Sequence, residues 1–143
     1  MTTPFYSDKC TVGNGIQARA GIGLEAVVGV YDIAAALLTA DVIHMVTLPA
    51  GARLVDVILA VDDLEAESGD ELTLSVGYTG ALEAIISQST VGQAGGVARA
   101  SVIGFNGLDF AAEDTIQVSA TAGAETGATE GTITLIALYT MNP

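Results

Sequence analysis

The sequence has no tryptophan and few of the residues that build catalytic or ligand-binding sites. Its 143 residues include one cysteine and one histidine, and only 5% are aromatic. Cys10 alone cannot form an internal disulfide, so the chain is not a secreted cystine scaffold. A nucleophile would need a positioned base, and His44 is the only imidazole. The shortage of aromatic rings argues against a sugar-binding platform and against base stacking on single-stranded nucleic acid.

Basic residues are also scarce, with 4 Lys and Arg against 17 Asp and Glu and a net charge of −13. Such a surface repels phosphate backbones and anionic lipids, which predicts no nucleic-acid partner and no membrane partner. It suits a positively charged protein partner. The longest apolar run, 33–38, is too short to span a bilayer. The first residues lack the apolar core of a signal peptide, so we expect synthesis in the cytoplasm.

The length favours a single domain, which at this size buries roughly 68–70% of its unfolded surface without a metal or a disulfide. Residues 1–25 differ from the rest because Gly and Pro interrupt them repeatedly. We predict an extended N-terminal arm over 1–25 and a body over 26–143. The arm is either a frayed terminus or a tether that orders against a partner.

The stretch Asp41–Leu64 is interpreted as the structural centre, with two strands joined by a tight turn. In the turn 48–51, Pro49 takes the second position and Gly51 the fourth, which suits a type I turn. We therefore predict a hairpin. Its second strand is apolar on both faces, as in the middle of a sandwich; Val55, Val57, Leu59 and Val61 share one face, and Leu54, Ile58 and Ala60 the other.

Further strands are predicted over 27–32, 72–78, 84–89, 97–105, 114–121 and 131–140. In the last of these, the two-residue period places Ile133, Leu135, Ala137 and Tyr139 on one face. The segment 33–40 is ambiguous, since its composition favours helix but its neighbours are β-rich, and we expect an extended segment with at most one helical turn. Asn106-Gly107 is a strong hairpin signal. About eight short strands with regular turn signals predict an all-β, single-domain, jelly-roll-like β-sandwich with an extended N-terminal arm.

An acidic loop over 62–71 contains the best cation-binding candidates. Asp63, Glu65 and Glu67 alternate as at the start of a calcium loop, but Gly69 and Leu74 stand where the motif fails. A solvated acidic loop is the favoured interpretation, and weak calcium binding is the alternative. His44 alternates with apolar neighbours on a predicted strand, and a metal site would need more than one such ligand. We predict no cofactor.

Several segments across residues 30–140 carry a resemblance to a known family: 41–43, 48–53, 55–57, 72–78, 113–116, 131–135 and Tyr139. In these segments the chain resembles small structural proteins of tailed bacteriophages, such as capsid decoration (cement) proteins. The resemblance implies a β-sandwich that trimerises on the shell. It implies no catalytic residues.

Three hypotheses follow. The leading one is a non-enzymatic virion structural protein, made in the host cytoplasm, that decorates the capsid exterior and stabilises it across neighbouring major capsid subunits as a homotrimer. Its arm would contact the shell through Phe5, Tyr6, Lys9 and Arg19, although Phe5 and Tyr6 could equally fold back on the body. The second is a receptor- or glycan-binding module of a spike or tail fibre, which the absence of tryptophan disfavours. The third is a small β-fold hydrolase, for which no nucleophile, base or metal set can be assembled.

Overall fold

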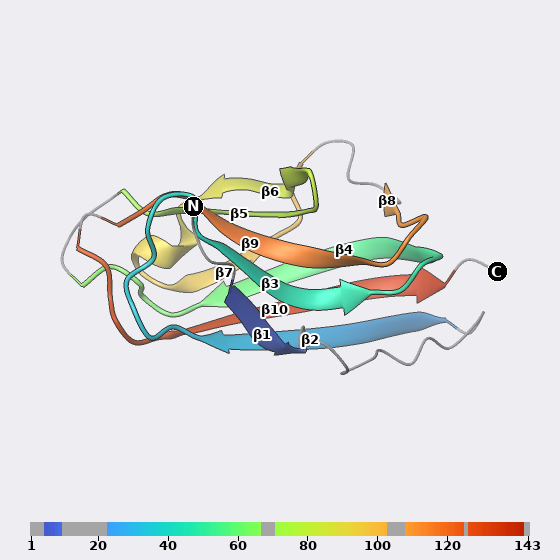
Figure 1. The fold of residues 1–143 in the computed structure, drawn as a ribbon, viewed down its shortest axis with the longest axis horizontal. Helices are drawn as coiled ribbons and strands as arrows, with labels where there is room; N and C mark the ends of the chain where they lie inside the picture. Colours follow the sequence, from blue (N-terminus) through green and yellow to red (C-terminus); the bar gives the residue numbers. More distant parts are fainter. Residues whose placement is uncertain (1–4, 10–22, 67–70, 103–107, 125, 142–143) are drawn as a thin grey trace.

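The strands form two sheets that pack face to face (Figure 1), and successive side chains along each strand point alternately toward the core and away from it. The computed structural model describes residues 5–9, 23–66, 71–102, 108–124 and 126–141, with only the backbone described for 6–9. Sheet A contains, in spatial order, β1 (Phe5–Lys9), β3 (Val42–Leu48), β9 (Asp114–Ala122), β5 (Thr73–Tyr78) and β6 (Ala81–Ser89). Sheet B contains β2 (Leu24–Asp32), β10 (Thr132–Met141), β4 (Ala52–Val61) and β7 (Gly96–Arg99), and the short β8 (Leu108–Asp109) also pairs with β4.

The strand order is that of a jelly roll. When β1 and β8 are set aside, the eight remaining strands can be counted along the chain. Their spatial order is then first–eighth–third–sixth in sheet B and second–seventh–fourth–fifth in sheet A. This order arises when one long antiparallel pairing is rolled into two sheets, and it leaves no need for helices. The predicted jelly-roll-like sandwich is confirmed. The described helix is a single 3₁₀ turn, Val91–Gln93, and no helix in the described ranges is long and apolar enough to cross a bilayer.

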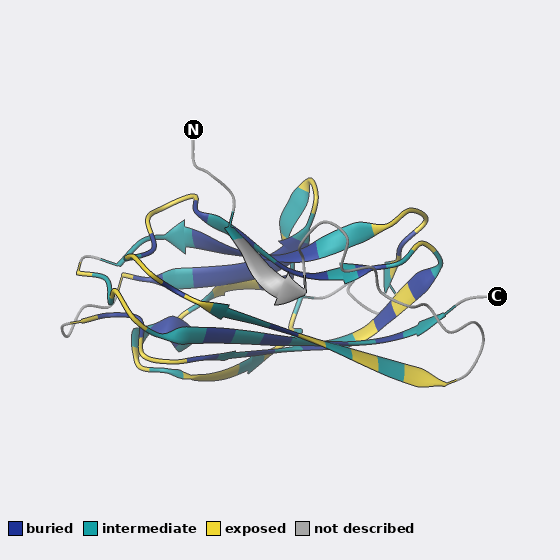
Figure 2. Cartoon of the chain, turned by 60° about the horizontal axis from the view of Figure 1, so that its bottom comes forward, coloured by how far each residue is buried: buried dark blue, intermediate teal, exposed yellow. Residues whose placement is uncertain are grey.

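The core lies between the two sheets, and Figure 2 shows buried residues on the strands of both layers. On β10 the inward residues Ile133, Leu135 and Ala137 are fully buried, as their two-residue spacing predicted. Gly29 on β2 lies beside Leu135, and a Cβ there would collide with the Met45 carbonyl oxygen of β3. The absence of a side chain at Gly29 therefore lets the two layers approach closely at this edge.

The predicted central hairpin is wrong in its pairing. Its two strands exist as β3 and β4, but β3 pairs with β1 and β9, whereas β4 pairs with β10 and β7. The turn closes one residue later than expected, with Ala52 N donating to Pro49 O over 3.2 Å and Gly51 at φ +88° in the third position. A tight turn fixes only a reversal of direction. Here the reversal carries the chain across from one layer to the other.

The predicted face pattern of β4 also changes at one residue. Leu138 pairs with Asp56 and Tyr139 pairs with Leu54, so Val55 is the extra residue of a bulge. Leu54 consequently points into the core on the same face as Val57, and Val55 is 47% exposed, whereas the two-residue period placed Val55 on the face of Val57. Beyond the bulge, Val57 is buried as predicted.

Two further predictions concern the Asn106-Gly107 hairpin, whose turn lies outside the described residues, and the segment 33–40. The described strands on either side of Asn106 and Gly107, β7 and β8, do not pair with each other, because both pair with β4. The next predicted strand, β9, belongs to sheet A. The segment 33–40 adopts neither helix nor strand; its Ile33 and Leu37 are buried, and Ala40 has a positive φ of 73°. Long-range packing thus resolves what its composition left ambiguous.

Candidate interaction surfaces

A row of hydrogen-bonded polar side chains crosses the outer face of sheet A. His44 Nδ1 lies 2.8 Å from Thr115 Oγ1, which accepts a hydrogen bond from Gln117 Nε2 over 2.9 Å. Gln117 also donates to Thr79 Oγ1, and Thr79 donates to Asp114 Oδ1 over 2.6 Å. Gln117 is only 4% exposed, so its amide needs these partners. The row connects β3, β9 and the turn between β5 and β6, so its role is structural.

His44 lies on a strand face, where the alternation of its neighbours placed it. Partial burial lowers the pKa of His44 below its ordinary value, and the nearby Asp114 carboxylate opposes this to a smaller extent. Its hydroxyl neighbour, Thr115, is the second residue of β9 and already accepts a hydrogen bond from the Gln117 amide. Within the described residues, no group of three or more His, Cys, Asp or Glu side chains is arranged to hold a metal ion. The polar residues of this row, apart from His44, were missed from the sequence because Thr and Gln on a strand give no distinctive signal.

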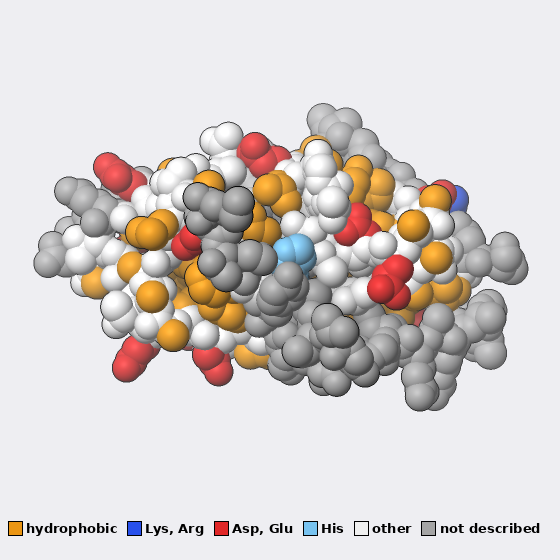
Figure 3. Space-filling model, viewed as in Figure 1, with side chains coloured by type: hydrophobic (Ala, Val, Ile, Leu, Met, Phe, Trp, Pro, Cys, Tyr) orange, Lys and Arg blue, Asp and Glu red, His pale blue; other side chains and the backbone are white. Residues whose placement is uncertain are grey.

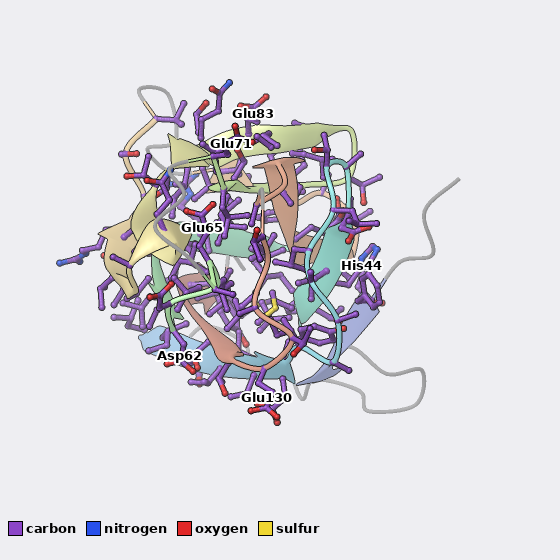
Figure 4. The ribbon with its side chains drawn as sticks, turned by 90° about the vertical axis from the view of Figure 1, so that its left-hand side faces the viewer. His44, Asp62, Glu65, Glu71, Glu83 and Glu130 are labelled. Carbon is purple, nitrogen blue, oxygen red and sulfur yellow. The ribbon has the colours of Figure 1, made fainter. Side chains whose placement is uncertain are left out.

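The acidic loop lies at one end of the sandwich (Figure 4). Glu65 is only 4% exposed, and its Oε1 accepts hydrogen bonds from the backbone N–H groups of Glu71 and Leu72, at 3.3 and 3.2 Å. Asp63 accepts from the backbone N–H of Glu65 over 3.0 Å. These two carboxylates therefore brace the loop's own backbone. Glu67, the third residue of the calcium hypothesis, lies outside the described residues, and weak calcium binding stays a prediction.

The residues of the predicted arm are described only in part. β1 runs parallel to β3 at the edge of sheet A, with Phe5 paired to Ile43 and Tyr6 to His44. The Phe5 ring packs on Tyr31 of β2 with a centroid separation of 5.8 Å, and it contacts the core. The side chains of Tyr6 and Lys9, and all of Arg19, lie outside the description. The arm boundary at residue 25 and the partner-binding role of these residues stay predictions.

The described surface carries its basic charge in only two places. Figure 3, which views the side of sheet A, shows carboxylates spread over the face and His44 near its centre. Arg53 forms a bidentate ion pair with Asp109, with N···O distances of 2.7 and 2.9 Å. Arg99 forms an ion pair with Asp56 through its Nη2 atom. Both arginines whose side chains are described are thus neutralised within the chain, which leaves the rest of the surface acidic.

A groove lies near β8. Tyr78 and Phe110 meet edge to face there, with centroids 5.7 Å apart. The lining continues along the segment 108–114. Two of its carboxylates already have partners, because Asp109 binds Arg53 and Asp114 accepts from Thr79. The groove therefore offers a binding surface for a partner more readily than a site of chemistry.

No protein-family model and no curated protein matches this chain. Solved capsid structures do match it. A chain in the capsid of Ralstonia phage GP4 is 30% identical, with a TM-score of 0.82 over 99% of both chains. A chain in the capsid asymmetric unit of cyanophage Pam1 is 26% identical, with a TM-score of 0.73 over 92% of this chain and 97% of that one.

A third solved capsid structure contains a chain of similar fold. A chain in the acid-stable capsid of Helicobacter pylori bacteriophage KHP30 is 16% identical, with a TM-score of 0.50 over 82% of this chain and 92% of that one. At this identity the likeness shows the fold alone. The match to the GP4 chain, by contrast, joins 30% identity to coverage of nearly the whole of both chains. This protein therefore belongs to a family of phage capsid proteins and is a structural component of a virion.

Proposed function

We propose that this protein is a decoration protein that binds the exterior of an assembled phage capsid across neighbouring major capsid subunits, as a homotrimer, and that it has no enzymatic activity. The observation that carries the proposal is the nearly full-length likeness to a chain of the GP4 capsid. A decoration protein needs a rigid body, a surface for its own copies and a contact that clamps the shell. A jelly roll with an N-terminal arm offers all three.

The charge of the chain supports binding to another protein of the shell rather than to the packaged genome. A net charge of −13 repels nucleic acid, and the described arginines are both engaged in ion pairs. Binding only to the assembled shell would stabilise the shell by mass action. Threefold positions on a shell favour a cyclic trimer.

In this proposal the arm makes the contact with the shell. Phe5 packs against Tyr31, and β1 pairs with β3, so residues 5–9 of the arm are held against the body. Tyr6, Lys9 and Arg19 are then the partner-binding residues. The two basic side chains are half of all the basic residues in the chain, so the arm is the least acidic part of the sequence.

Co-sedimentation with particles of the source phage, stripped of their auxiliary proteins, tests the proposal. We expect saturable binding in a whole-number ratio to the shell subunit, together with a higher melting temperature of the particles. Absence of binding to the shell, with the chain found only on tails or fibres, would contradict decoration and favour the attachment-module alternative.

The arm can be tested by removing its charge. The double variant Lys9→Gln, Arg19→Gln is expected to weaken shell binding at least about tenfold, since each charge-assisted contact contributes about 1.5–3 kcal/mol when desolvated. A matched control, Thr90→Glu with Ser101→Glu, lowers the net charge by the same amount on exposed positions of the body outside the groove. Equal loss of binding in both variants would show that total charge matters and that the arm does not make the contact.

A further inference from the structure

The outer face of sheet B is apolar across four strands. We call it the outer B face and define it by nine residues: Leu24, Ala26, Val28, Val30, Ile58, Ala60, Val97, Ile136 and Leu138. The pairing register of the strands places these residues side by side, because Ile136 pairs with Val28 on one side and with Ile58 on the other. The next row joins Val30, Thr134, Ala60 and Val97. These pairings make one continuous patch.

Much of this apolar surface is open to solvent. Val97 is 65% exposed, Leu24 57% and Val28 41%. Together with Val55 at the bulge, they are four of the five exposed large hydrophobic residues in the described part of the chain. β4 and β10 are apolar on both sides, yet sheet A covers only their inner side. A contiguous exposed patch of this kind marks an interaction surface.

The outer B face is also electrically neutral in a strongly acidic chain. Its only charged residues in the central rows are Arg99 and Asp56, which form an ion pair with each other. At its margin, Arg53 is paired with Asp109. Both described arginines therefore lie on this side of the molecule, and each is neutralised by a neighbouring carboxylate.

We propose that a second copy of this chain packs against the outer B face. Two copies that each carry −13 repel one another, and the repulsion is least where the approaching surfaces have no net charge and the carboxylates lie elsewhere. A basic partner would instead be drawn to the acidic surfaces, and it would gain nothing from a neutral apolar sheet. The inference rests on the proposed function, because it identifies the surface through which the decoration trimer would form.

The test compares two apolar residues of equal exposure. Val97→Glu places a carboxylate on the outer B face, and Leu38→Glu places one on the loop before β3, where Leu38 is 64% exposed. The molar mass of each purified protein is measured by light scattering after size-exclusion chromatography. We expect the wild type and Leu38→Glu at a multiple of 14.4 kDa and Val97→Glu at the single-chain mass, with identical circular dichroism for all three.

Ionic strength provides a second measurement on the wild type. Salt screens the repulsion between acidic copies and leaves apolar contacts intact, so added salt should increase the associated fraction. A wild-type chain that stays monomeric at all salt concentrations would overturn the proposal, as would a Val97→Glu variant that associates normally. A monomeric wild type whose shell binding is lost in Val97→Glu would overturn it too, and would assign the face to the major capsid subunit.

The two proposals fail separately. Association in solution without binding to stripped particles would contradict decoration and leave the outer B face as a contact between copies. Shell binding by a chain that never associates would contradict the contact between copies and leave decoration as the function.

Discussion

Replacing Leu135 with alanine is expected to lower the free energy of unfolding by about 2–5 kcal/mol. Leu135 is fully buried at the centre of sheet B, where it pairs with Gly29 of β2 on one side and Leu59 of β4 on the other. Truncation removes apolar contacts and leaves a cavity. Gly29 has no side chain to fill it, and the close approach of β3 prevents a larger residue there. We therefore expect the upper part of the range.

Urea denaturation followed by circular dichroism measures this effect, with the protein concentration held constant because association also contributes to stability. Leu138→Ala is the matched control, since it deletes the same atoms three residues along the same strand, from the half-exposed outer side. We expect it to cost less than about 1 kcal/mol at concentrations where the chain is monomeric. Equal losses for the two variants would contradict the assignment of inner and outer faces.

Replacing Glu65 with alanine is expected to lower the free energy of unfolding by about 2–4 kcal/mol, because hydrogen bonds to a charged acceptor contribute more than neutral ones. The variant would leave the Leu72 N–H buried without its acceptor. It would also remove the brace that ties the start of the acidic loop to its end. Glu65 Oε2 is buried with no hydrogen-bond partner among the described residues, and this offsets part of what the carboxylate contributes.

Two companion variants separate the carboxylate from the loop as a whole. Glu65→Gln keeps an oxygen for the two N–H donors and should lose less stability than Glu65→Ala. Glu71→Ala removes an exposed side chain and leaves its backbone N–H bond to Glu65 intact, so its stability should stay within about 0.5 kcal/mol of the wild type. The melting temperatures of the three variants measure these losses. A Glu65→Ala melting temperature equal to that of Glu71→Ala would show that the Glu65 hydrogen bonds contribute nothing to stability.

The sequence predicted where strands occur better than it predicted how they pair. The two-residue period is local, so it placed the buried residues of β10 correctly along with the strand itself. Pairing joins residues far apart in the chain, such as Asp32 and Thr132, and no local pattern encodes it. For the same reason the Pro49–Gly51 turn was assigned to a hairpin when it links two layers. The bulge at Val55 depends on its partner strand and could not be seen in β4 alone.

The interaction surfaces were less predictable than the fold. Apolar residues on both faces of β4 indicated burial on both sides, but the sequence does not reveal whether the chain's own layers supply the cover. The polar row through Gln117 depends on hydrogen bonds among three separate segments. The neutrality of the outer B face depends on Arg99 meeting Asp56, which lies 43 residues earlier. Only assembled sheets bring such pairs together.

The jelly-roll order has a consequence for how the chain folds. β10 comes last among the described strands, yet it lies between β2 and β4 and joins them into one sheet. Until β10 docks, β2 has no partner in sheet B, and its exposed backbone edge is open to other chains. Closing a loop of 100 residues between Asp32 and Thr132 is entropically slow, so folding is expected on the millisecond-to-second scale of all-β proteins. Association between incompletely folded copies through the open edge of β2 would therefore compete with the completion of sheet B inside each copy.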